Sequence, residues 1–267
     1  MSNLALRVIT AVVALPLVGA LIAWREPMGF GFFVIVVAGL ALTEYVNMTM
    51  AAARERLRFA IVAVGLALGV GVYLRPELAL VWVLGAVVAS AAAVLLEPGD
   101  VATSGPRLGV AGFGVLYLGL LPISLALLHR DAAHGPVWVC AAIAATFGND
   151  TGAYFAGRAL GRHKLYPAIS PAKTVEGAVG GLVATVGILL AGHFTIAPTI
   201  TLTDCLLIGV PAAVLGPIGD LVESMIKRSA GVKDSGKLLP GHGGMLDRID
   251  ALLFVSSWVY VYVIYLR

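Results

Sequence analysis

Long apolar runs are the feature of this 267-residue sequence that most limits its possible folds. A run of about 17–25 predominantly apolar residues can cross a bilayer as an α-helix. About nine such runs can be delimited, at residues 4–24, 28–50, 59–74, 78–96, 108–128, 136–158, 175–197, 204–228 and 251–266. Only 12% of the residues are charged, whereas a soluble domain carries about 25%. The sequence therefore predicts an all-α, polytopic integral membrane protein with about nine transmembrane helices.

Lysine and arginine residues are distributed unevenly between alternate loops. Of the 18, all but four lie at the N-terminus or in the loops after the second, fourth, sixth and eighth runs. The four exceptions are Arg25, Arg75, Arg130 and Arg267. Because basic loops tend to remain on the cytoplasmic side, we expect a cytoplasmic N-terminus and a C-terminus on the opposite side.

Charged residues inside apolar runs are the next informative feature, because such a residue costs about 2.5–3.5 kcal/mol at the bilayer centre on insertion scales. In the first half of the chain the main one is Glu44, for which a cavity-lining and an interfacial position both remain open. The second half carries three polar segments. We therefore divide the chain into an N-terminal transmembrane region, residues 1–135, and a catalytic transmembrane region, residues 136–267, with a polar cytoplasmic cleft.

The first polar segment begins with Asn149 and Asp150, near the end of the sixth run. Asp150, Tyr154 and Arg158 recur every four residues and would share one helical face. They could line a cleft, or Asp150 and Arg158 could simply form an intrahelical ion pair.

The second polar segment contains Ser170, Lys173, Thr174 and Glu176. The Ser170-Pro171 pair is typical of a turn, after which the seventh helix would begin. A helix N-terminus beside lysine and threonine favours a phosphate group, because the unpaired N–H groups and the helix dipole both attract anions. The alternative is that these basic residues only satisfy the cytoplasmic charge bias.

The third segment contains two groups of acids separated by a polar loop. Asp220, Ser224 and Lys227 occupy positions i, i+4 and i+7 of one helical face, and Asp247 and Asp250 lie three residues apart at the start of the last run. Two helices could thus present carboxylates to each other. Carboxylates without cysteine suit Mg²⁺, which usually binds to one or two acids together with substrate phosphates. Lysine and arginine beside them suit phosphate oxygens, so the pattern indicates metal-assisted phosphoryl or nucleotidyl transfer.

The stretch from Ser224 to Asp250 resembles the signature of the phosphatidate cytidylyltransferase family. The matching positions are Ser224, Lys227, Arg228, Lys233, Asp234, Gly236, Pro240, His242, Gly243, Gly244, Asp247, Arg248 and Asp250. The two upstream segments are similar to the family as well, whereas the first five runs match only in their hydrophobic character.

This resemblance implies the conversion of CTP and phosphatidic acid to CDP-diacylglycerol and pyrophosphate. It implies catalytic roles for Asp220, Asp247, Lys227, Arg228 and Asp234. Substrate contacts are implied for Asn149, Asp150, Ser170, Lys173, Thr174, Glu176, Ser224, Lys233, His242, Gly243, Gly244 and Arg248. Metal ligation is implied for Asp220, Asp247 and Asp250, with Mg²⁺ as the cofactor and K⁺ as a candidate second cation. A homodimer in a bacterial inner membrane is expected, with its active site facing the cytoplasm and no nucleic-acid partner.

Two other functions remain open at this stage. A CTP-dependent polyprenol or dolichol kinase would transfer the terminal phosphate of CTP to a lipid alcohol and release CDP. An ion-coupled transporter could instead use its intramembrane acids to bind cations. The matches at Lys233-Asp234 and from His242 to Asp250 favour the cytidylyltransferase over the kinase. The clustering of basic residues with the acids argues against the transporter.

Overall fold

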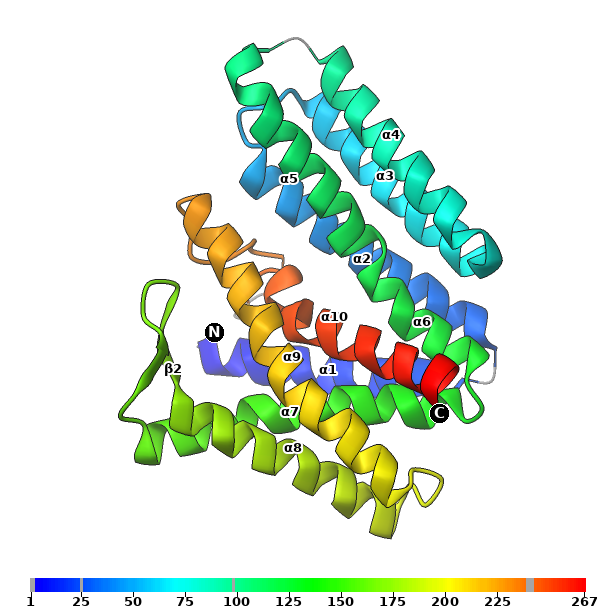
Figure 1. The fold of residues 1–267 in the computed structure, drawn as a ribbon, viewed down its shortest axis with the longest axis vertical. Coiled ribbons are helices and arrows are strands. Elements are labelled where there is room, and N and C mark those ends of the chain that lie inside the picture. Colours follow the sequence, from blue (N-terminus) through cyan, green and yellow to red (C-terminus); the bar gives the residue numbers. More distant parts are fainter. Residues whose placement is uncertain (1–2, 25, 98, 239–242) are drawn as a thin grey trace. The chain divides into compact units, whose positions relative to one another are not determined.

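The computed structural model describes residues 3–24, 26–97, 99–238 and 243–267, except for the side chains of residues 3–11 and 13. The described chain is mainly helical, which confirms the all-α prediction (Figure 1). Its α-helices are α1 (Asn3–Ala23), α2 (Pro27–Thr49), α3 (Glu55–Leu74), α4 (Ala79–Leu96), α5 (Val101–Gly119), α6 (Leu121–Asp131), α7 (Gly135–Leu160), α8 (Val175–Thr195), α9 (Leu202–Ser229) and α10 (Leu246–Val261). Shorter elements are η1 (Pro76–Leu78), β1 (Lys164–Tyr166), β2 (Ser170–Thr174) and the π-helical turn η2 (Tyr262–Leu266).

Seven helical segments of the described residues are long and apolar enough to cross a membrane. They are Pro27–Thr49, Glu55–Leu74, Pro76–Leu96, Val101–Asp131, Val175–Thr195, Leu202–Ser229 and Leu246–Leu266. Many of their large apolar side chains are exposed, such as Leu95 at 83% and Val183 at 68%, as expected where lipid is the solvent. The protein is therefore an integral membrane protein. The predicted count of nine spans remains a prediction, because the first and sixth runs form helices that are not among these seven.

The chain forms two compact units. Unit 1 consists of Met1–Arg130 and Ala230–Arg248, and unit 2 consists of Asp131–Ser229 and Ile249–Arg267. In unit 1, helices α2, α3, α4 and α5 pack against one another (Figure 1). Helices α3 and α5 approach closely at Gly119, where an added Cβ would lie 2.7 Å from the backbone oxygen of Gly65. Small residues allow such backbone approach between membrane helices.

Unit 2 is built around the pair α7 and α8, with α9 packed against both (Figure 1). A short hairpin, in which β1 and β2 are antiparallel, connects α7 to α8. The predicted turn at Ser170-Pro171 is wrong, since these residues begin β2 and the turn lies at residues 167–169. Pairing of Ser170 with Tyr166 extends the backbone there. Backbone polar groups of this segment thus find their hydrogen-bond partners on the neighbouring strand. The local sequence did not indicate that pairing.

The Gly152→Ala substitution in α7 is expected to destabilise unit 2. An added Cβ would lie 2.6 Å from the backbone oxygen of Gly180 in α8 and would also contact Ala184. Overpacking of this kind costs about 1–3 kcal/mol, so the unfolding midpoint in detergent should fall. Gly187→Ala, in α8, is the matched control because no atom lies within 4 Å of its added Cβ. Equal midpoints for the two variants would contradict the close packing of α7 on α8.

Candidate active site

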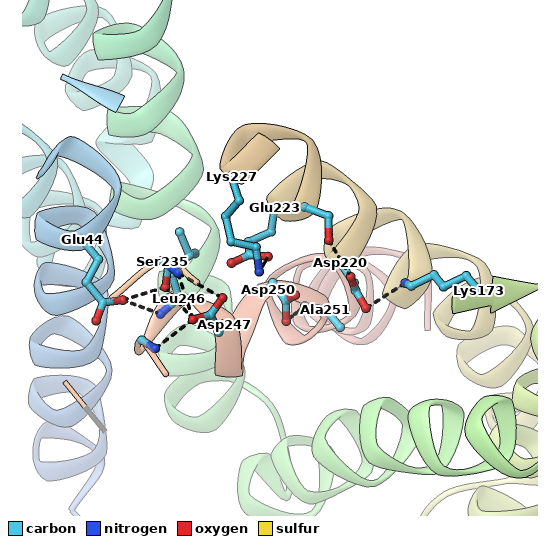
Figure 2. A network of polar contacts seen from close by, with 12 residues as sticks. Glu44, Lys173, Asp220, Glu223, Lys227, Ser235, Leu246, Asp247, Asp250 and Ala251 are labelled. Carbon is cyan, nitrogen blue, oxygen red and sulfur yellow. Dashed lines mark hydrogen bonds and ion pairs between the residues drawn. The ribbon is translucent and has the colours of Figure 1, made fainter. Parts of the chain in front are cut away.

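Asp220 in α9 is the centre of the polar contacts in unit 2 (Figure 2). Its Oδ2 lies 2.8 Å from Nζ of Lys173, which comes from β2, and its Oδ1 accepts a hydrogen bond of 3.3 Å from Ser224 Oγ. The Ser224 contact follows from the i, i+4 spacing that the sequence showed. Lys173 also donates to the backbone oxygen of Pro217 at 3.5 Å. The hairpin therefore brings an ammonium group to a carboxylate on a membrane helix.

Two further acids of unit 2 interact electrostatically with Asp220. Asp150 from α7 and Asp250 from α10 each repel Asp220, and they also repel each other. Lys173 attracts Asp150, and Lys227 attracts Asp250. Three helices and a hairpin thus gather three carboxylates and two ammonium groups. Three negative charges in one place favour a cation or a protonated group among them.

A cavity of about 430 Å³ opens beside these residues. Its polar lining residues include Asn149, Asp150, Tyr154, Arg158, Lys173, Thr174 and Asp220. Leu165, Ala153 and Pro217 give it an apolar part. Arg158 donates a hydrogen bond of 2.9 Å to the Tyr154 hydroxyl, and within the described residues no ion pair joins Asp150 to Arg158. A cavity with both polar and apolar walls suits an amphipathic ligand.

Thr174 and Glu176 organise the junction between the hairpin and α8. Thr174 is the N-cap of α8, and its Oγ1 accepts a hydrogen bond of 3.1 Å from the Gly177 N–H. The Glu176 carboxylate accepts from the backbone N–H groups of Arg162, at 3.1 Å, and His163, at 3.2 Å. It also lies 2.6 Å from His163 Nδ1. In this structure Glu176 therefore holds the hairpin in place, while its predicted contact with substrate remains a prediction.

Glu223 was not among the residues singled out from the sequence. It is only 1% exposed, and its Oε2 forms an ion pair with Nζ of Lys227 one turn later in α9 (Figure 2). The i, i+4 spacing of Glu223 and Lys227 was the signal that could have revealed the pair. Arg228 follows at the exposed end of α9. Lys227 is therefore both a partner of a buried acid and a positive charge near Asp250.

In unit 1, Asp247 accepts several hydrogen bonds at the start of α10 (Figure 2), while its predicted catalytic and metal-binding roles remain predictions. Its Oδ2 accepts hydrogen bonds from Ser235 N at 3.0 Å, Ser235 Oγ at 3.0 Å and Gly244 N at 2.8 Å. Gly243 adopts a φ of +81°, which favours glycine. Lys233, Asp234 and Arg248 are exposed around this loop. His242 and Pro240 lie outside the described residues, so their predicted contributions are not described.

The donor chemistry of unit 2 fits a hard divalent cation. Among the described residues, no three histidine, cysteine, aspartate or glutamate side chains are arranged to hold a metal ion by themselves. Mg²⁺ does not require such a cage, since one or two carboxylates usually hold it together with substrate phosphates and water. Asp150, Asp220 and Asp250 are carboxylates that repel one another, and a divalent cation would relieve that repulsion.

The fold and the polar residues together define a class of protein, namely a polytopic membrane protein with carboxylates and ammonium groups clustered beside a cavity. The model of the cytidylyltransferase family matches residues 5–266 of the chain. A phosphatidate cytidylyltransferase of Brucella suis is 35% identical over 98% of this chain and 94% of its own length. One from Staphylococcus saprophyticus is 35% identical over 93% of this chain and 95% of its own. The chain belongs to the cytidylyltransferase family and is thus a nucleotidyltransferase.

Proposed function

We propose that this cytidylyltransferase joins CTP to phosphatidic acid, producing CDP-diacylglycerol and pyrophosphate. The observation that carries the proposal is the similarity to phosphatidate cytidylyltransferases along nearly the whole chain, at 35% identity over 98% of it. The polar cluster of unit 2 supports it, because it combines carboxylates with ammonium groups. The mixed walls of the adjoining cavity also suit a lipid that carries a phosphate.

The proposed reaction is an in-line displacement at the α-phosphorus of CTP. A phosphate oxygen of phosphatidic acid forms the new P–O bond, while the bond to the β-phosphate breaks and its electron pair leaves with pyrophosphate. The attacking phosphate monoester is already largely ionised near neutral pH, because its second pKa is about 6. The protein therefore mainly has to position the two phosphates and neutralise their charge.

Within unit 2, Lys173 and Lys227 supply positive charge for this task. Asp220 orients the Lys173 ammonium group through their 2.8 Å contact, so that it can face phosphate oxygens of a substrate. Arg228, at the exposed end of α9, would bind further phosphate oxygens. For the exposed Lys233 and Arg248 of unit 1, substrate contacts are proposed from the resemblance to the family alone. One or two of the carboxylates Asp150, Asp220 and Asp250 would hold Mg²⁺ together with substrate phosphates, and the ion would supply positive charge to neutralise them.

The assembly and the orientation of the enzyme belong to the same proposal. The Lys and Arg bias of alternate loops supports a cytoplasmic active site in a bacterial inner membrane, where CTP would arrive from water and phosphatidic acid from the bilayer. A homodimer is proposed from the resemblance to the family. Crosslinking in native membranes would test the dimer, and labelling of an introduced cysteine at exposed Lys237 would test which side it faces.

The reaction is tested with purified protein in detergent, CTP labelled at the α-phosphate, phosphatidic acid and Mg²⁺. We expect the label to enter lipid while an equal amount of pyrophosphate is released, and chelation by EDTA to stop both. Label recovered as CDP after a polyprenol is supplied would indicate the lipid kinase instead. If folded protein transfers no label to phosphatidic acid, the proposed function is wrong.

A further inference from the structure

Glu44 of α2 contacts the signature segment, although about 190 residues or more separate them in the sequence. We define the signature loop as the described residues 233–238 and 243–247, all of which belong to unit 1, as does Glu44. Glu44 Oε2 accepts a hydrogen bond of 3.0 Å from Leu246 N and one of 3.1 Å from Ser235 Oγ (Figure 2). Leu246 is the first residue of α10. A negative charge at this N-terminus is favourable because the helix dipole is positive there.

Ser235 links Glu44 to Asp247. The Ser235 hydroxyl lies 3.1 Å from Glu44 Oε2 and 3.0 Å from Asp247 Oδ2. A serine hydroxyl has one proton to donate, so the two carboxylates share a single donor. The backbone N–H groups of Ser235 and Gly244 then hold Asp247, while that of Leu246 holds Glu44. Loss of Glu44 would therefore affect the hydrogen bonding of Asp247.

Two glycines of the signature loop lie directly against the Glu44 side chain. An added Cβ at Gly236 would lie 2.7 Å from Glu44 Cδ, and one at Gly244 would lie 2.5 Å from Glu44 Oε2. Glu44 Oε1 is buried and has no hydrogen-bond partner among the described residues. The Glu44 side chain therefore fills the space beside both of these glycines.

We propose that Glu44 is a positioning residue of the enzyme. It holds the signature loop and the start of α10, and through Ser235 it orients Asp247 without touching a substrate itself. Lys233 is the first residue of this loop and Arg248 directly follows its last, and both are exposed. Glu44 thereby fixes the backbone from which these two side chains project. The catalytic consequence rests on the proposed function, whereas the ordering of the loop does not.

Steady-state kinetics of Glu44→Ala test the catalytic consequence. Loss of both hydrogen bonds should lower kcat/KM for CTP by about 30-fold, mainly through a higher KM. In Glu44→Gln the amide oxygen can still accept from Leu246 and Ser235, so kcat/KM should stay within about threefold of the parent. Glu55→Ala, which removes an exposed acid from the first turn of α3, is the control. A purely structural role would lower kcat with the folded fraction and leave KM unchanged, which would overturn the proposal.

Hydrogen–deuterium exchange tests the loop independently of activity. In Glu44→Ala, peptides covering residues 233–238 and 243–248 should exchange faster, because the hydrogen bond of Leu246 N is lost and the side chain that packs against Gly236 and Gly244 is removed. Peptides covering 164–174 in unit 2 should not change, and neither should any peptide of Glu55→Ala. Unchanged exchange over 233–238 and 243–248 would overturn the positioning role whatever the activity. An inactive parent protein with faster exchange in the variant would refute only the proposed function.

Gly236→Ala provides a reciprocal test. Its Cβ should displace the Glu44 carboxylate and reproduce the kinetic defect of Glu44→Ala. In a Glu44→Ala background there is no carboxylate to displace, so adding Gly236→Ala should change kcat/KM little further. Such non-additivity is the mark of residues that act through one contact. Losses that multiply independently in the double variant would contradict the coupling.

Discussion

The Asp220→Asn variant is expected to lose about a thousandfold in kcat while it remains folded, which is the order of effect seen when a catalytic electrostatic group is removed. Asparagine keeps the size of the side chain and can still accept the hydrogen bond from Ser224. It lacks the charge that orients Lys173 at 2.8 Å and that would bind Mg²⁺. The measurement is the initial rate of lipid labelling at saturating CTP and phosphatidic acid.

The dependence of this rate on Mg²⁺ identifies what Asp220 contributes. If Asp220 is a ligand, Asp220→Asn should require a higher Mg²⁺ concentration for half-maximal rate, and Lys173→Gln should not. Glu55→Gln, at an exposed acid of α3, controls for loss of a negative charge elsewhere. A rate within about threefold of the parent for Asp220→Asn would remove this residue from the proposed catalytic group.

Lys227→Met is expected to destabilise the protein strongly as well as to inactivate it. The substitution removes the ammonium group that pairs with Glu223, which is 1% exposed. Breaking one side of a buried pair costs about 3–5 kcal/mol, because an uncompensated charge remains in the interior. The unfolding midpoint in detergent should therefore fall well below that of the parent.

A double variant separates the two roles of Lys227. In Lys227→Met/Glu223→Gln the buried charge is gone, so the unfolding midpoint should return close to that of the parent. Activity should remain lost, because the Lys227 ammonium group no longer attracts Asp250 or faces a substrate phosphate. Recovery of activity in the stable double variant would show that Lys227 acts only by neutralising Glu223. An unchanged midpoint in Lys227→Met would contradict the stabilising pair.

Hydropathy and helical periodicity predicted much of what the structure contains. The all-α class followed from the length of the apolar runs, which leave backbone groups no partners in lipid except those within a helix. The shared face of Asp220 and Ser224 was predicted from their spacing and appears as a hydrogen bond. The β-hairpin was missed because its strands are three and five residues long. Strands this short have no readable alternation.

The sequence by itself determined which residues are chemically exceptional, since a charge inside an apolar run is costly wherever the run folds. That argument singled out Asp150, Asp220 and Asp250, but it could not assign them partners from other elements of the fold. Only the tertiary structure decided that Lys173 from a hairpin meets Asp220, and that Glu44 from an early helix holds Ser235 and Leu246. These partners are distant in sequence. Residue spacing predicts only which side chains are neighbours within one helix. Contacts between elements depend instead on how whole helices pack, which the spacing does not reveal.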